Sequence, residues 1–134
     1  MILIPVTEEK RAETAAAAEA FLKKIRPLLK CGECNFSRSE KNIAFDRMFP
    51  LKHQEKVDIL LSLSAEDCVK IAPNDNPRYA DSQVYVFLKT LELLSYGEEE
   101  KIRLYIKMYL TEQRNFDIVI VISFHQEGMH GLDY

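Results

Sequence analysis

The most regular pattern of apolar and polar positions in the chain lies between Lys101 and Leu110. The even positions from Ile102 to Leu110 are all apolar, whereas the odd positions carry two lysines, one arginine and two tyrosines. Successive side chains of a β-strand point to opposite faces of a sheet. The pattern therefore predicts a strand with one face in the core and another face that presents three cations interleaved with Tyr105 and Tyr109.

A second apolar stretch, from Phe116 to His125, predicts the neighbouring strand. Residues 118–122 are apolar at both parities, which indicates a central position in the sheet. The stretch ends at His125, an odd position like Tyr105, so we expect both side chains on the same face. At the end of its strand, His125 is expected near the surface.

Two further regions complete the predicted strands and loops. Residues 83–89 are rich in β-formers and predict another strand, and residues 90–100 either extend it or form a helical turn before Gly97. Residues 33–38 and 72–82 have the composition of loops.

The N-terminal half of the chain carries helical patterns instead. Residues 8–30 combine early glutamates and an alanine run with apolar residues at helical spacing. Ser39 is a capping residue for a short helix over 40–48, and a third helix is predicted over 52–63, before a capped turn at 64–67. Helices followed by strands predict an α+β fold, with N-terminal helices packed on an antiparallel sheet of three or more strands.

Composition and charge place the chain among ordinary globular proteins. Its 134 residues are enough for one core and predict a single domain. No apolar run reaches the ~20 residues of a membrane-spanning helix, and the N-terminus lacks the basic region of a signal peptide. The net charge of −3 argues against a generally basic nucleic-acid-binding surface, so any contact with RNA requires a local patch.

The three cysteines predict a reducing compartment, the cytoplasm, because their number is odd and no secretory signal is present. Cys31 and Cys34 have the spacing of a zinc half-site or a redox pair. A structural zinc site needs two more ligands, and no second motif of this kind follows. A loop with incidental thiols is the simpler interpretation, and no metal or cofactor is predicted. Cys68 is expected to behave as a small apolar residue.

The outer face of the predicted sheet has two interpretations. It is either a solvated face of an antiparallel sheet or a surface for polyanions, with cations on phosphates and tyrosines on bases or in proton transfer. The polar residues that this face and its rim could gather are Lys70, Gln83, Tyr85, Arg103, Tyr105, Lys107, Ser123 and His125.

Several short motifs, in the same order along the chain, resemble one protein family. They are Leu-Ser-Ala-Glu-Asp-Cys-Val-Lys at 63–70, Leu-Tyr-Ile-Lys at 104–107 and Val-Ile-Ser-Phe-His at 121–125, preceded by Arg38 and Lys41-Asn42. Together they resemble the MqsR family of toxins from toxin–antitoxin pairs, small RNA-cleaving proteins with a RelE-like fold.

The resemblance covers residues 36–127 and implies a RelE-like core there. Residues 1–32 would form an N-terminal helical extension and residues 128–134 a loose tail. The implied partners are RNA and a cognate protein antitoxin, with no membrane. The long N-terminal helix also suits contact with a partner or a homodimer.

Residue by residue, the resemblance implies a catalytic set. It places the family's lysine at Lys70 and its strand tyrosine at Tyr105. Gln83 lies about one residue from the family's glutamine, and His125 stands where some members carry a lysine. The residues left to bind RNA on the same strands are Arg103, Lys107 and Tyr85.

The implied chemistry is metal-independent cleavage of mRNA by its own 2′-hydroxyl. The enzyme must align this nucleophile, supply an acid and a base, and stabilise charge on the phosphoryl oxygens. Histidine is the side-chain type whose ordinary pKa lies nearest neutrality, so His125 is the best acid or base. Tyr105 would donate to the phosphate or the 5′-oxygen. The alternative is a non-catalytic RelE-like interaction domain, which the negative net charge favours.

Overall fold

The structure is a computed structural model that describes residues 8–79, 82–113 and 116–128. Three helices come first along the chain and a five-stranded sheet is completed at its end, so the α+β prediction is confirmed. The elements, in chain order, are α1 (Glu8–Lys30), β1 (Cys34–Phe36), α2 (Glu40–Met48), α3 (His53–Leu61), the 3-10 turn η1 (Ala65–Asp67), β2 (Cys68–Pro73), the 3-10 turn η2 (Pro77–Tyr79), β3 (Gln83–Ser95), β4 (Glu98–Gln113) and β5 (Phe116–Gln126).

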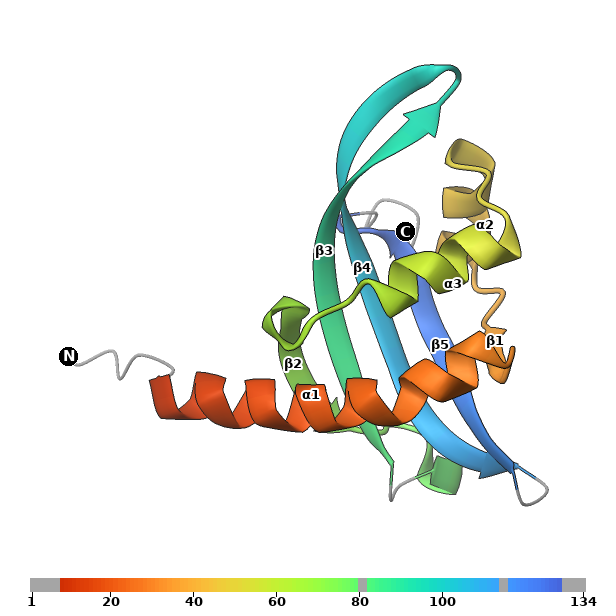
Figure 1. Ribbon diagram of the computed structural model, residues 1–134. Coiled ribbons are helices and arrows are strands. Elements are labelled where there is room, and N and C mark those ends of the chain that lie inside the picture. The colour runs from red at the N-terminus through yellow and green to blue at the C-terminus, as the bar shows by residue number, and fades with distance from the viewer. Residues whose placement is uncertain (1–7, 80–81, 114–115, 129–134) are drawn as a thin grey trace.

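The strands lie in the order β1-β5-β4-β3-β2. β1 is parallel to β5, and the other neighbours are antiparallel. In Figure 1, α1 and α3 cross the same face of the curved sheet, whereas α2 lies to the side of the sheet, next to β5. The face away from α1 and α3 is called the outer face below.

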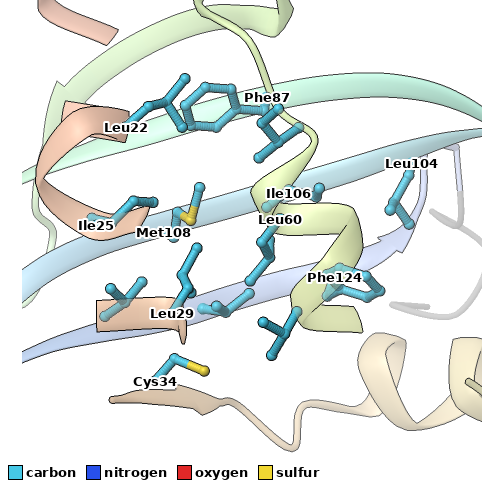
Figure 2. Close-up of a cluster of buried hydrophobic side chains, with 14 of the residues drawn as sticks. Leu22, Ile25, Leu29, Cys34, Leu60, Phe87, Leu104, Ile106, Met108 and Phe124 are labelled. Carbon is cyan, nitrogen blue, oxygen red and sulfur yellow. The ribbon is translucent and has the colours of Figure 1, made fainter. Parts of the chain in front are cut away.

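The core lies between α1, α3 and the sheet (Figure 2). Ile102 is 2% exposed, and Leu104, Ile106 and Met108 are fully buried, so the predicted core face of β4 is confirmed. Tyr105 and Lys107, between them, point to the outer face and are half-buried. The alternation predicted this correctly because a strand fixes the facing of each side chain locally.

Two strands lie where loops were predicted. β1 begins at Cys34 inside the predicted loop 33–38, and β2 extends to Pro73, into the predicted loop 72–82. Both are short edge strands, and their strand geometry comes from hydrogen bonds to β5 and β3 rather than from their own residues. Pro27 lies inside α1, which continues to Lys30.

Residues 90–100 extend the strand. β3 continues to Ser95 and turns into β4 through Tyr96 and Gly97, whose φ angles are +52° and +84°. Two consecutive positive φ angles are those of the tight turn that matches the twist of a β-hairpin. Glycine adopts this angle without strain, and Tyr96 is held there at the protruding tip, 93% exposed.

β5 carries one extra residue relative to β4. Lys107 pairs with Ser123 and Met108 pairs with Val121, so Ile122 forms a bulge. Before the bulge the core residues of β5 are odd-numbered, Val119 and Val121, and after it the core residue is Phe124. The bulge therefore changes which parity faces the core.

The cysteine thiols lie in different surroundings. Cys34 is buried in the core (Figure 2), whereas Cys31 is exposed and Cys68 is half-buried. Burial, together with the nearby Glu33 carboxylate, raises the pKa of the Cys34 thiol. Among the described residues, no three His, Cys, Asp or Glu side chains gather closely enough to hold a metal ion. None of the described helices is long and apolar enough to cross a membrane.

We expect a thiol reagent such as Ellman's reagent to modify Cys31 rapidly in the folded protein and Cys34 only after unfolding. The reagent reacts with an accessible thiolate, and Cys34 is neither accessible nor readily ionised. The release of the coloured product over time measures both phases. Cys31→Ser should remove most of the fast phase, and a fast phase that survives replacement of both Cys31 and the half-buried Cys68 by serine would contradict the burial of Cys34.

Candidate functional site

A hollow of about 870 Å³ lies on the outer face, between β4, β5 and the N-terminal end of α2. We call it the outer hollow. Its lining combines cations, carboxylates, hydroxyls and two aromatic rings: Ser37, Ser39, Glu40, Lys41, Tyr105, Lys107, Ile122, Ser123, His125, Glu127 and Gly128. The structure therefore gathers Tyr105, Lys107, Ser123 and His125 from the sequence-predicted candidates in one place.

Tyr105 and His125 form the aromatic part of the outer hollow. They are direct cross-strand partners, and their rings stack with centroids 5.4 Å apart and planes 20° apart. His125 is only 7% exposed, so the prediction of a surface position for it is wrong. The reason is that the ring stacks on Tyr105 of β4 while α2 packs along β5, so little of the ring is exposed.

A neighbouring backbone group contacts one ring nitrogen of His125. Its Nδ1 lies 3.1 Å from the carbonyl oxygen of Gln126. A carbonyl oxygen only accepts hydrogen bonds, so this contact is a hydrogen bond when Nδ1 carries the proton. In the neutral ring Nε2 then holds the lone pair, which is the state of a general base.

Lysines flank this pair across the sheet. Lys107 pairs with Ser123 on β5 and with Val86 on β3, and Val86 in turn pairs with Lys70 on β2. Lys70 thus occupies the outer-face row of Lys107, but two strand spacings away, about 10 Å. It is exposed and lies outside the lining of the outer hollow.

Arg103 occupies the next outer-face position of β4, at the rim. Its guanidinium lies 3.6 Å from the Glu127 carboxylate, and its carbonyl accepts a 2.7 Å hydrogen bond from the Glu127 backbone N–H. The Arg103 side chain is 56% exposed, so this ion pair contributes little to stability. Its main local effect is to hold a carboxylate beside the outer hollow.

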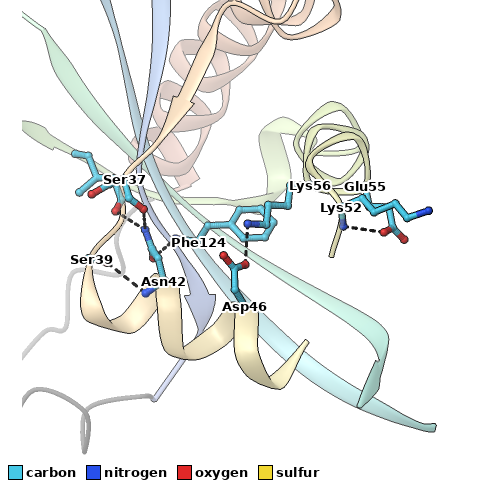
Figure 3. A network of polar contacts seen from close by, with 9 residues as sticks. Ser37, Ser39, Asn42, Asp46, Lys52, Glu55, Lys56 and Phe124 are labelled. Atoms are coloured by element: carbon cyan, nitrogen blue, oxygen red, sulfur yellow. Dashed lines mark hydrogen bonds and ion pairs between the residues drawn. The ribbon is translucent and has the colours of Figure 1, made fainter. Parts of the chain in front are cut away.

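The N-terminal end of α2 forms the opposite wall. Ser39 caps the helix, and its hydroxyl accepts from the backbone N–H of Asn42 at 3.3 Å (Figure 3). Glu40 and Lys41 in the first turn both reach the lining. The helix N-terminus adds a partial positive charge, which favours an anion at this wall, and Glu40 and Glu127 oppose it.

Gln83 and Tyr85 do not reach the outer hollow. Tyr85 pairs with Met108, a core residue, and its ring stacks on Phe21 of α1 with centroids 3.9 Å apart. Gln83 and Tyr85 line a separate hollow beside α1. The prediction that Tyr85 shares the face of Tyr105 is therefore wrong, and burial, with a smaller contribution from Cys68, raises the pKa of the Tyr85 phenol.

The α2 wall is the part of the site that the sequence analysis missed. Ser37, Ser39 and Glu40 enter the lining because β1 and α2 return to β5 from far away in the chain. The pair Lys41-Asn42 was noted only as part of the resemblance. Beside Tyr105 on β3, the outer-face residue is Leu88, so this side of the site is apolar.

Comparison with known proteins adds no further assignment. No family model, no curated protein and no solved structure matches this chain. The function is therefore argued from the residues and geometry of the outer hollow.

Proposed function

We propose that this chain is an endoribonuclease that cleaves mRNA by 2′-hydroxyl attack in the outer hollow, as the toxin of a toxin–antitoxin pair. The observation that carries the proposal is the stacked pair of Tyr105 and His125 beside Lys107. It puts an imidazole, a phenol and a cation together at the wall formed by a helix N-terminus. These are the groups that metal-independent phosphodiester transfer requires.

In this mechanism His125 acts as the base. Its Nε2 accepts the 2′-hydroxyl proton while the 2′-oxygen bonds to phosphorus and the bond from phosphorus to the 5′-oxygen breaks. Tyr105 donates its phenolic proton to the departing 5′-oxygen, which leaves as the 5′-hydroxyl, and the proton taken up by His125 restores the phenol through solvent. Lys107 and the N-terminus of α2 stabilise the added negative charge. The products are a 2′,3′-cyclic phosphate and a 5′-hydroxyl end.

The cations beyond the outer hollow fit a role in RNA binding. Lys70 in the row of Lys107, and Arg103 at the rim, could contact phosphates on either side of the cleaved bond. We assign no step of the reaction to Gln83 or Tyr85, because they line the separate hollow beside α1.

The second candidate is a non-catalytic interaction domain of the same shape. Two carboxylates, Glu40 and Glu127, lie in the lining of the outer hollow, and the net charge of the chain is −3. Both features disfavour a polyanion and suit a protein partner with basic residues.

Cleavage of a single-stranded RNA in the presence of EDTA tests the proposal. We expect cleavage to continue, because the nucleophile, base and cations are all supplied by RNA and protein. The products should carry 2′,3′-cyclic phosphate ends, identified by mass spectrometry. RNA with a 2′-deoxy substitution at the cleaved position is the matched control and should stay intact.

Two results would count against it in different ways. Activity that is lost in EDTA and restored by a divalent cation would refute the metal-independent mechanism. No cleavage of any RNA, together with no growth arrest on expression in a bacterial host, would favour the interaction domain.

A further inference from the structure

The facing of His125 depends on the bulge at Ile122. Val119 and Val121 point into the core, so a regular strand would send every later odd-numbered side chain, including His125, to the core as well. The extra residue reverses this alternation, and Ile122 and Ser123 both reach the outer hollow. His125 meets Tyr105 only because the bulge is present and lies at this position.

A single side chain from α2 spans the bulge (Figure 3). The Asn42 Nδ2 donates to the carbonyl of Ile122 at 3.0 Å, and the Asn42 Oδ1 accepts from the backbone N–H of Phe124 at 2.9 Å. The same Nδ2 also donates to the carbonyl of Ser37 at 2.8 Å. Asn42 thus bonds to the backbone on both sides of Ser123, from a position that is only 6% exposed.

These hydrogen bonds take the place of those that a neighbouring strand would make to β5. β1 pairs with β5 through Phe36, which lies opposite Val121, and Ser37 adds a bond to the Val121 carbonyl. Beyond this point, within the described part of the chain, no strand continues along the edge of β5. Buried backbone groups left without hydrogen-bond partners destabilise the fold. Asn42 supplies the partners for Ile122 and Phe124 at the point where the bulge disturbs the ladder.

We propose that Asn42 is a positioning residue that fixes the bulge of β5 and thereby holds His125 on the outer face against Tyr105. The hydrogen bonds of its side chain go to the backbone of Ser37, Ile122 and Phe124, so it would act on the proposed reaction through the position of His125. The structural part of this inference is independent of the proposed function, and only its effect on cleavage rests on that function.

The sharpest variant is Asn42→Asp, which keeps the size of the side chain. It retains an acceptor for the Phe124 N–H but removes both donors, and it places a carboxylate oxygen against the carbonyls of Ser37 and Ile122. We expect the bulge to shift or lose its fixed geometry. In NMR spectra, the cross-peaks between the Tyr105 and His125 ring protons should weaken or disappear. Asn42→Ala should do the same, because it removes all three bonds.

Asp46→Ala is the matched control on the same helix. It breaks the 2.7 Å ion pair between α2 and Lys56 of α3 but leaves Asn42 and the bulge in place. The ring cross-peaks should persist in this variant. A folded Asn42→Asp protein with unchanged cross-peaks between Tyr105 and His125 would overturn the proposal.

A measurement on the unmodified protein covers the case in which the Asn42 variants do not fold. The Phe124 amide, bonded to Asn42, should exchange with deuterium as slowly as the amides paired in the interior of β5. Rapid exchange of this amide would show that Asn42 does not hold the bulge, and the proposal would fail on that result alone.

RNA cleavage separates this proposal from the proposed function. If both hold, Asn42→Asp should lower kcat by about 10²-fold, the cost of a small misplacement of a reacting group, with a smaller change in KM. Combining it with His125→Ala should add little to the loss from His125→Ala alone, because both act through one group. Unmodified protein that cleaves no RNA, but shows the NMR and exchange results above, would refute the function and leave the positioning role intact.

Discussion

Replacing His125 with alanine is expected to slow RNA cleavage by about 10²–10⁴-fold, the usual contribution of a general acid or base. The ring lies in the outer hollow, stacked on Tyr105, with Nδ1 held at the Gln126 carbonyl. Its loss removes the group to which we assign the 2′-hydroxyl proton in the proposed reaction. Single-turnover cleavage of a labelled RNA measures the effect. The variant should also unfold slightly more easily, by about 1 kcal/mol, because a stacked aromatic pair is lost.

His125→Lys separates proton transfer from positive charge. Lysine supplies a cation at the same position but does not titrate near neutrality in its ordinary range. We therefore expect this variant to remain well below the unmodified protein at pH 7. Full activity of His125→Lys would mean that His125 acts only as a cation or spacer. Full activity of His125→Ala would remove His125 from the reaction altogether.

Phe45→Ala is expected to have the largest effect on stability, about 3–5 kcal/mol, which is typical of a buried phenylalanine. Phe45 of α2 is fully buried, and its ring contacts those of Phe49 and Phe124, with centroids 5.1 and 6.0 Å apart. Alanine would leave a cavity between α2 and β5. Urea unfolding followed by circular dichroism measures the change in the free energy of unfolding.

Tyr96→Ala provides the comparison. Tyr96 is 93% exposed at the tip of the β3–β4 hairpin. Its replacement should change stability by no more than about 0.5 kcal/mol, as for other surface sites. A loss below 1 kcal/mol for Phe45→Ala would contradict the packing of α2 on β5.

The face of each strand could be predicted only where the pattern is local. Lys107 and Tyr105 were placed correctly because the alternation from 101 to 110 is unbroken. The facing of β3 depends on its register with β4, and that register is fixed by the turn at Tyr96 and Gly97. This turn pairs odd positions of β3 with even positions of β4, so Tyr85 lies opposite Met108. The same register turns Gln83 away from the outer hollow. The alternation within β3 alone does not reveal this register.

The prediction that His125 lies on the outer face is correct, but the cause is the bulge at Ile122, which the alternation of residues does not reveal. In a regular strand His125 would face the core with Val119 and Val121, and the bulge at Ile122 turns it to the outer face. A bulge has no reliable signature in a strand that is apolar at both parities. Nor does the sequence reveal that Asn42 returns to this strand, because the contact is tertiary.

The position of β5 between β1 and β4 determines where the outer hollow lies, and it also determines the stage of folding at which the hollow can form. The hydrogen bond from Phe124 to Asn42 joins residues 82 positions apart, whereas β3, β4 and β5 are connected by hairpins. Contacts that close long loops carry the larger entropic cost and slow folding. During synthesis the N-terminal elements leave the ribosome first. Tyr105 therefore enters the folding chain before His125, and the α2 wall can close only after β5 has been made, so a partly synthesised chain lacks an assembled site.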